Sequence, residues 1–291
     1  MKRRFVDAHI HLYDLSTGWY PALNGNPEEA VDELGRSYAK LIGRNYLLDD
    51  YRADTKDFEV PKFIHITACQ TPPRWPDETR WLQRLYAREG VPNAIIGRTD
   101  LTMPLSDIAV ELREHAQSPN FRGIRNYEGV DFAADHTFRA FDTMLECGIR
   151  LYDLIAHVDI QPDAARLAAR FPDMVFVLEH AGWPKSHDAD AFARWREGLG
   201  EIARLPNTRC KISGLGMFLD RWSVEAMRPW VLSCIEAFGV SRCMFASNFP
   251  VDGLFSTYAE LINGFEDIVR GLSEVDQEAL FAGNAEAIYR I

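Results

Sequence analysis

The sequence lacks the segments that mark secreted or membrane-spanning proteins. Its basic start, MKRRFVDAHIHLYDL, carries no apolar stretch of the kind found in signal peptides. No window approaches the roughly 18 uninterrupted apolar residues that a spanning helix needs. Internal repeats and linkers are absent as well. We therefore expect a cytoplasmic protein that does not associate with membranes.

Cysteine is also scarce, with 5 residues among 291, spaced widely along the chain. No CxxC pair occurs, and no two cysteines have the spacing of zinc ligands. This excludes a small disulfide-stapled scaffold. We expect the cysteines to be buried, reduced thiols.

Basic residues are too few to favour nucleic acid as a partner. Lys and Arg number 32 against 43 acidic residues, which gives a formal net charge of −11. Such a surface repels phosphate backbones, so an anionic small molecule would need a local basic patch. The apolar fraction of 47% and charged fraction of 26% are those of an ordinary globular protein.

Short apolar runs alternate with longer amphipathic stretches, which is the pattern of a parallel βα sheet. Eight such runs in a chain of this length predict a (β/α)8 TIM barrel. A doubly wound open sheet is the alternative, but the glycine-rich phosphate loop typical of it is missing after the first run. The predicted strands are Phe5–Leu12, Lys62–Cys69, Ala94–Leu101, Phe121–Tyr127, Ile149–Ala156, Val175–His180, Arg209–Gly214 and Cys243–Val251.

We expect one domain over residues 1–291. The least regular region is 16–60, a long loop excursion rich in Tyr, Asn and Gly after the first strand. We expect it to cover the active-site face of the barrel. Trp and Phe on the outer helices would allow a homodimer.

Histidines mark the carboxyl ends of several predicted strands, where barrel active sites lie. His9 and His11 are two apart on the first strand, so both can face the lumen. His180 ends the sixth strand and can converge with them. Three protein ligands with an open fourth position form a catalytic zinc site. His65 on the second strand is a weaker candidate, for substrate binding.

Other polar residues lie on the later strands. Arg125, near the end of the fourth strand, would bind a substrate carboxylate, or else form an internal ion pair, for instance with Asp153. Lys211 and Ser213 share one face of the seventh strand, so both or neither point inward. Asn248 belongs at the active-site rim at the end of the eighth.

Taken in order, these motifs resemble one enzyme family over nearly the whole chain. HIH, RGIR, LEHAG, KISGLG and FASNFPVD, with ETRWLQ and LFAGNAEAIYR, are similar to the amidohydrolase superfamily (amidohydrolase family 2). Within it, they are similar to the lactonase-type branch, which includes enzymes resembling L-fuconolactonase and 2-pyrone-4,6-dicarboxylate hydrolase. The resemblance implies a barrel that hydrolyses a lactone ring. It assigns His9, His11 and His180 to a metal site and Arg125 to a substrate carboxylate.

The sequence departs from this family at the eighth strand, where the usual catalytic Asp is replaced by Asn248. An amide cannot accept a proton as a carboxylate does, so the usual general base is missing. With a bound metal the need for a protein base is smaller, and Asn248 could orient the metal-bound water. Without a metal, another carboxylate must act as the base. Asp252 is the first choice, then Asp153, then Glu179, which we expect to point outward beside His180. With no bridging Lys or carboxylate on the fourth strand, we expect one divalent metal, most simply Zn²⁺. Members of the branch differ in metal need, so metal-free catalysis stays open.

The predicted function is hydrolysis of a small anionic lactone, a cyclic ester, by an activated water. His180, Asn248 and Asp252 are the candidate catalytic residues. His65, Arg125, Asp153 and Ser213 are candidates for binding substrate. Lactone isomerisation or metal-dependent decarboxylation at the same site is the second hypothesis. A non-catalytic sugar-acid binder is the third, because fold alone does not fix function.

Overall fold

The computed structural model describes residues 3–26, 35–72, 74–126, 130–219 and 222–291. Eight parallel strands follow one another around a single sheet in sequence order, as a (β/α)8 barrel requires. The predicted fold is therefore confirmed. The strands are β1 (Arg4–Ile10), β2 (Glu59–Ile66), β3 (Ala94–Gly97), β4 (Phe121–Arg125), β5 (Leu151–Leu154), β6 (Val175–Leu178), β7 (Thr208–Ile212) and β8 (Cys243–Phe245).

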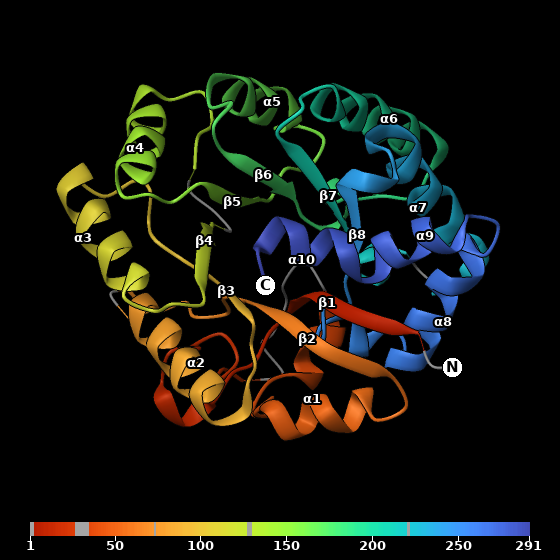
Figure 1. Cartoon of the computed structure of the whole chain (residues 1–291), viewed down its shortest axis with the longest axis horizontal. Helices are drawn as coiled ribbons and strands as arrows, with labels where there is room; N and C mark the ends of the chain where they lie inside the picture. Colours follow the sequence, from red (N-terminus) through yellow and green to blue (C-terminus); the bar gives the residue numbers. More distant parts are fainter. Residues whose placement is uncertain (1–2, 27–34, 73, 127–129, 220–221) are drawn as a thin grey trace.

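A ring of helices surrounds these strands (Figure 1). Amphipathic sequence and end caps explain them: Asp188 accepts a hydrogen bond from Ala191 N at the start of α6, and Thr257 with Glu260 forms a capping box at α8. None of the described helices has the length and apolar character needed to cross a membrane. The outer helices are α1 (Leu48–Thr55), α2 (Trp75–Glu89), α3 (Leu105–Ala116), α4 (Asp135–Glu146), α5 (Gln161–Arg170), α6 (Ala189–Ala203), α7 (Val224–Phe238) and α8 (Tyr258–Val269).

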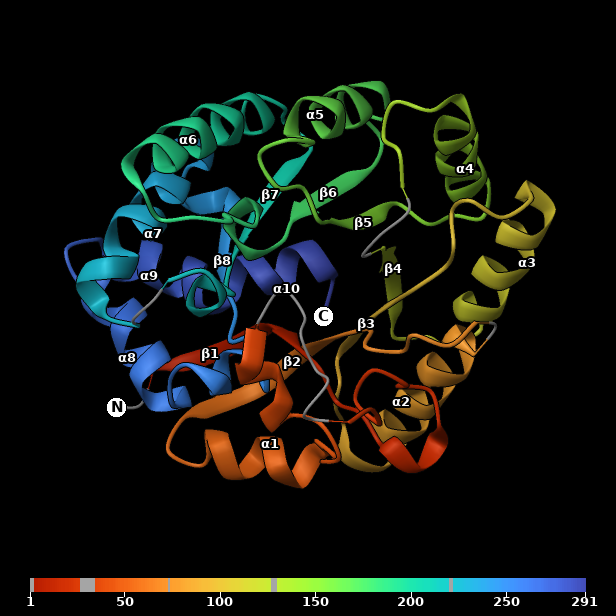
Figure 2. The same cartoon turned by 180° about the vertical axis from the view of Figure 1, so that it is seen from behind.

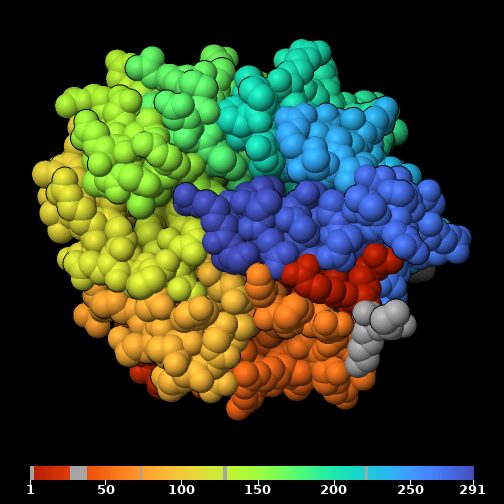
Figure 3. Space-filling view, in the orientation of Figure 1, coloured from red at the N-terminus to blue at the C-terminus, as the bar shows by residue number. Residues whose placement is uncertain are grey.

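The C-terminal segment closes one end of the barrel. It consists of α9 (Glu274–Glu278), a π-helical turn (Ala279–Gly283) and α10 (Asn284–Tyr289). It crosses the middle of the face in Figure 3, and α10 is visible within the ring of strands from behind (Figure 2). Its side chains pack against apolar residues that the strands direct into the lumen at this end. The cluster consists of Val6, Ala8, Ile64, Ile66, Ala94, Ile96, Leu151, Val177, Met244, Ala246, Ala282, Ala285 and Tyr289.

Two of the predicted segments include residues outside the described ranges. These are Tyr127, the predicted end of the fourth strand, and residues 27–34 of the excursion at 16–60. The described part of that excursion contains short 3₁₀ turns and α1 before β2 begins at Glu59. All five cysteines are free thiols. Four of them are buried, as predicted, and Cys147 is only half-buried.

The barrel closes between β1 and β8 by a few hydrogen bonds rather than a full ladder. Asn248 N donates to His9 O at 2.8 Å, and His11 N donates to Phe249 O at 2.8 Å. The Asp7 side chain completes the seam, since its Oδ1 accepts from Ser247 N at 2.8 Å. A carboxylate here takes the place of a backbone carbonyl.

Asp7 also ties the seam to the helix layer. Its Oδ2 accepts hydrogen bonds from the hydroxyls of Tyr51 on α1, at 2.9 Å, and Tyr258 on α8, at 3.0 Å. All three side chains are buried, so water cannot replace the carboxylate as the hydrogen-bond acceptor. One carboxylate thus joins Tyr51, Tyr258 and Ser247 to β1, and its Oδ1 also accepts a longer hydrogen bond from His9 N at 3.4 Å.

Asp7→Ala should therefore lower the free energy of unfolding by about 3 kcal/mol or more, because it leaves three buried donors without an acceptor. Urea denaturation followed by circular dichroism measures this. Tyr258→Phe is the matched control, since it removes one of the three hydrogen bonds and should cost about 1 kcal/mol. A wild-type unfolding midpoint for Asp7→Ala would show that the seam does not depend on this carboxylate.

Candidate active site

His9 and His11 face the lumen because β1 contains a bulge. Asp7 pairs with Phe63 and Ile10 with His65, so three steps along β1 match two along β2. Strict alternation would place Asp7 on the same face as His9. The extra residue instead lets Asp7 contact the helix layer while His9 joins the buried polar groups of the lumen.

The two imidazoles meet at their Nε2 atoms, which lie 3.0 Å apart. His11 Nδ1 lies 2.8 Å from the carbonyl oxygen of Ile66, which can only accept, so this nitrogen carries the proton. The lone pair of a neutral His11 is therefore on Nε2, facing His9. A backbone carbonyl that fixes the imidazole tautomer is the usual support of a metal-binding histidine.

The end of β6 brings two adjacent residues to one site. Alternation continues from Val175 and Val177 to Glu179, whose side chain is buried in the lumen. The expectation that Glu179 points outward is therefore wrong. His180 should then face away, but it has a φ of 49° and begins a left-handed turn, which brings its ring within 4.6 Å of the His9 ring, measured between centroids. Residues other than glycine rarely adopt such φ values, and each costs about 1–3 kcal/mol.

Ser213 fixes the orientation of His180. Its Oγ lies 3.0 Å from His180 Nδ1, and both residues are buried. Gly214 leaves room for the ring, since a Cβ there would lie 2.6 Å from the same nitrogen. Because Nδ1 is engaged, Nε2 is the nitrogen left for a ligand. Ser213 was predicted to bind substrate; the structure places it as a partner of His180.

Two buried ion pairs lie beside the histidines. Arg125 Nη1 donates to Glu179 Oε2 at 2.8 Å, and its Nη2 donates to the carbonyl of Thr67 at 2.9 Å. Lys211 Nζ donates to Asp153 Oδ2 at 2.6 Å. Of the two roles open to Arg125, the structure thus shows an internal ion pair, with Glu179 as the partner in place of Asp153.

Burial and these charges set the protonation states. Burial lowers the pKa of His180 to about 3 and the pKa values of His9 and His11 well below their usual range, so all three are neutral. Burial alone would raise the pKa of Glu179, but the positive charges of Arg125 and Lys211 outweigh it and lower that pKa to about 2. The site therefore combines neutral imidazoles with an ionised carboxylate.

This combination suits a divalent metal. One donor atom each from His9, Glu179 and His180 lie within 4.8 Å of one another. Two nitrogens on a tetrahedral zinc would be about 3.3 Å apart, close to the His9–His11 separation. Glu179 Oε1 is buried and has no hydrogen-bond partner among the described residues, so it is available to coordinate a metal ion. The residues that fit one metal ion are therefore His9 and His180 of the predicted set together with Glu179, and His11 lies beside them through its contact with His9.

Past the end of β8, Asn248 and Asp252 lie together. Asn248 has a φ of 58° and donates from Nδ2 to Asp252 Oδ1 at 3.2 Å. The other carboxylate oxygen, Oδ2, accepts from Gly214 N at 3.1 Å. Burial raises the pKa of Asp252 to about 7, although both hydrogen bonds oppose the shift. A carboxyl group with this pKa can accept and return a proton near neutral pH.

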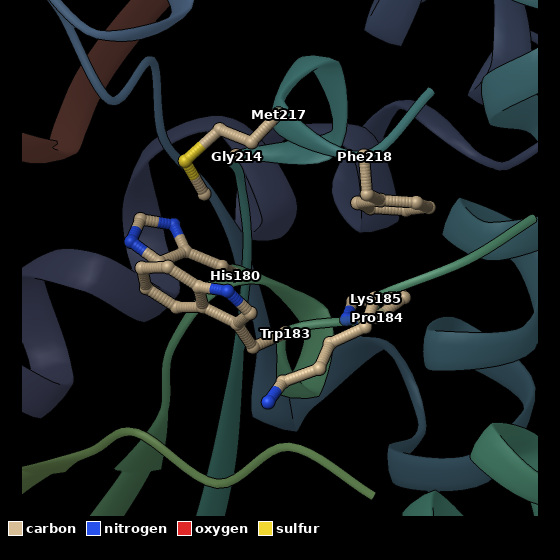
Figure 4. Close-up of a pocket in the computed structure, with 7 residues that line it drawn as sticks. All are labelled: His180, Trp183, Pro184, Lys185, Gly214, Met217 and Phe218. Carbon is tan, nitrogen blue, oxygen red and sulfur yellow. The ribbon is translucent and has the colours of Figure 1, made fainter. Parts of the chain in front are cut away.

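A cavity of about 270 Å³ opens beside His180. Figure 4 shows that its walls come from the turn after β6 and the loop after β7. Apart from His180, Lys185 is its one titratable lining residue among those described. The lining residues are His180, Trp183, Pro184, Lys185, Gly214, Met217 and Phe218.

Sequence reasoning misjudged His65 and missed the cavity walls. His65 alternates with Ile64 and Ile66 of the lumen, and its Nε2 lies 3.0 Å from the carbonyl of Leu12, so it is not brought into the site. Trp183 and Lys185 follow the LEHAG motif directly. An aromatic residue and a cation just past a strand end were the available signal.

Comparison with known sequences gives matches over nearly the whole chain. An uncharacterized protein of Sinorhizobium fredii is 36% identical over 98% of both chains. The L-fucono-1,5-lactonase of Burkholderia multivorans is 31% identical, covering 98% of this chain and 96% of its own.

Solved structures agree with these matches. An amidohydrolase from Burkholderia multivorans with bound zinc superposes with a TM-score of 0.82 at 26% identity, covering 99% of this chain and 100% of its own. A family model for amidohydrolases matches residues 6–291. This chain, with its barrel and its histidine and carboxylate cluster at the strand ends, belongs to the amidohydrolase family.

Proposed function

We propose that this protein hydrolyses the cyclic ester of a small sugar-acid lactone. The observation that carries the proposal is the surroundings of His180, which lines the cavity. The neutral His9 and the ionised Glu179 lie beside it, and Asp252 is bound to Gly214, which packs against the His180 ring. The likeness to L-fucono-1,5-lactonases at 31% and 30% identity supports the same reaction class.

His9, His11, His180 and Glu179 would hold one divalent metal, and zinc suits their nitrogen and oxygen donors. When bound, such a metal supplies Lewis-acid polarisation of the lactone carbonyl. Arg125 and Lys211 keep Glu179 ionised, and Ser213 holds the His180 ring. These contacts keep the donors in place without substrate.

Asp252 is the proposed general base. It takes a proton from the attacking water, and the new C–O bond forms at the ester carbonyl as the ring C–O bond breaks. The same carboxyl group returns the proton to the leaving alkoxide. Asn248 and the Gly214 amide orient the carboxylate through the hydrogen bonds described above. The products are one acid and one alcohol within the opened chain.

The reaction class can be tested by assaying a panel of sugar-acid lactones in H₂¹⁸O. Hydrolysis places one ¹⁸O atom in the carboxylate of the ring-opened product. Isomerisation incorporates none, and decarboxylation releases CO₂. Either of these results, or binding without turnover across the panel, would rule out the proposed hydrolysis.

His9→Ala is expected to remove bound metal and activity together, because it deletes one nitrogen donor of the cluster. Metal content by mass spectrometry, measured beside lactone turnover, checks both. His136→Ala, which removes an exposed histidine outside the site, should keep about one metal per chain. Full activity of metal-free wild type would instead assign the histidines to hydrogen bonding with the carbonyl oxygen.

The pH dependence tests Asp252. A base must be deprotonated, and its pKa of about 7 means that kcat/KM should rise with pH through about 7 and level off above it. Asp252→Asn should abolish this acidic limb and lower kcat about 100-fold or more. A wild-type pH profile for Asp252→Asn would exclude this residue as the base.

Asn248→Gly separates orientation from proton transfer, because glycine adopts the φ of 58° without strain. Loss of the amide removes a hydrogen bond that stabilises the Asp252 carboxylate. The acidic limb should therefore move to higher pH, and kcat should fall on the order of 100-fold. Unchanged kcat and an unchanged limb would show that Asn248 only forms a turn.

A further inference from the structure

The cavity beside His180 is built from residues of contrasting character. Trp183, Met217 and Phe218 provide an apolar wall, and Lys185 adds a positive charge (Figure 4). Its volume of about 270 Å³ suits a single small ring rather than an extended chain. An aromatic face and a cation together recognise a flat, apolar ring face that carries an anionic group.

The backbone that presents this wall is strained. His180, Ala181, Gly182 and Trp183 all have positive φ, between 47° and 78°, and three of them are not glycine. This turn ends the extended backbone after β6 and places Trp183 beside His180 in the cavity wall. Strain of this kind persists where the surrounding structure holds it and function uses it.

Two buried side chains from the outer helices hold the turn. Trp195 Nε1 on α6 donates to Ala181 O at 2.6 Å, and Gln161 Nε2 on α5 donates to Gly182 O at 3.3 Å. Gly198 on α6 makes room for this arrangement, because a Cβ there would lie 2.0 Å from Gln161 Oε1. The backbone turn that carries Trp183 is thus held by the outer helices.

The inner cations of the site are already engaged. Arg125 and Lys211 are fully buried and paired with Glu179 and Asp153. Lys185 differs, since it is exposed and no carboxylate of the described residues lies within 4.0 Å of its Nζ. On a chain of net charge −11, such a cation at the cavity is a local attractor for anions.

We propose that Lys185 binds an anionic substituent of the lactone while its ring lies against Trp183, which makes a lactone with a free carboxylate the preferred substrate class. The inference rests on the proposed lactone hydrolysis. It transfers the contact with the substrate carboxylate from Arg125 to Lys185.

The test compares two lactones of the same ring size, one with a free carboxylate and one with a neutral hydroxymethyl group there. Lys185→Met should raise KM for the carboxylated lactone about 10- to 100-fold and leave kcat nearly unchanged. KM for the neutral lactone should change little. Lys185→Arg should restore most of the loss, and Lys56→Met controls for removal of an exposed lysine elsewhere. Added salt should raise KM of the wild type only for the carboxylated lactone.

Equal effects of Lys185→Met on both lactones, or no effect on either, would overturn the assignment. If the wild type hydrolyses neither lactone, the proposed function fails instead. Calorimetric binding of the ring-opened diacid then decides the role of Lys185. Weaker binding to Lys185→Met than to wild type supports the anion contact, and equal binding overturns it.

Discussion

The site depends on the ion pair between Arg125 and Glu179 in the middle of the barrel. Both side chains are fully buried, so each charge would be very costly without the other. Lys211 and Asp153 form a second pair beside it, and Tyr289 donates to Asp153 from α10. Two cations and two anions thus balance within the lumen. This balance keeps Glu179 ionised next to His9, where its Oε1 lies 3.4 Å from Nδ1.

Two local departures from regular strand geometry place the histidines against this network. The bulge in β1 turns His9 inward although Asp7 contacts the helices, and the left-handed turn after β6 brings His180 to the same side as its neighbour Glu179. Neither departure favours folding by itself. Both are held by hydrogen bonds from outside the site: Asp7 with two tyrosines at the first, Trp195 and Gln161 at the second. Stability of the outer layer and geometry of the site are therefore coupled.

The sequence was enough to predict the barrel and the positions of His9, His11 and His180 at strand ends, because these follow from strand count and chain order. The direction of Glu179 was predicted wrongly. Assigning His180 to the lumen by alternation forces its neighbour outward, and only a turn with positive φ admits both. The sequence also did not identify Glu179 as the partner of Arg125, because the two residues lie two strands apart and meet only across the lumen. The eighth strand was predicted to run from Cys243 to Val251 but ends at Phe245, and beyond it only isolated hydrogen bonds to β1 continue the pairing, with Asn248 at a positive φ.

The cations of this barrel divide into two groups. The buried ones stabilise the site, and an exposed one is available to contact a substrate. A buried cation must be paired before substrate arrives, because leaving it unpaired would cost several kcal/mol. Arg125 and Lys211 meet this requirement with Glu179 and Asp153, and so neither is left to pair with a substrate. A cation that is to pair with a substrate anion must be solvated before the substrate binds. Lys185, exposed at the edge of the cavity, meets that condition. Selectivity for substrate charge can therefore change at the rim without disturbing the charge balance that holds the inner site.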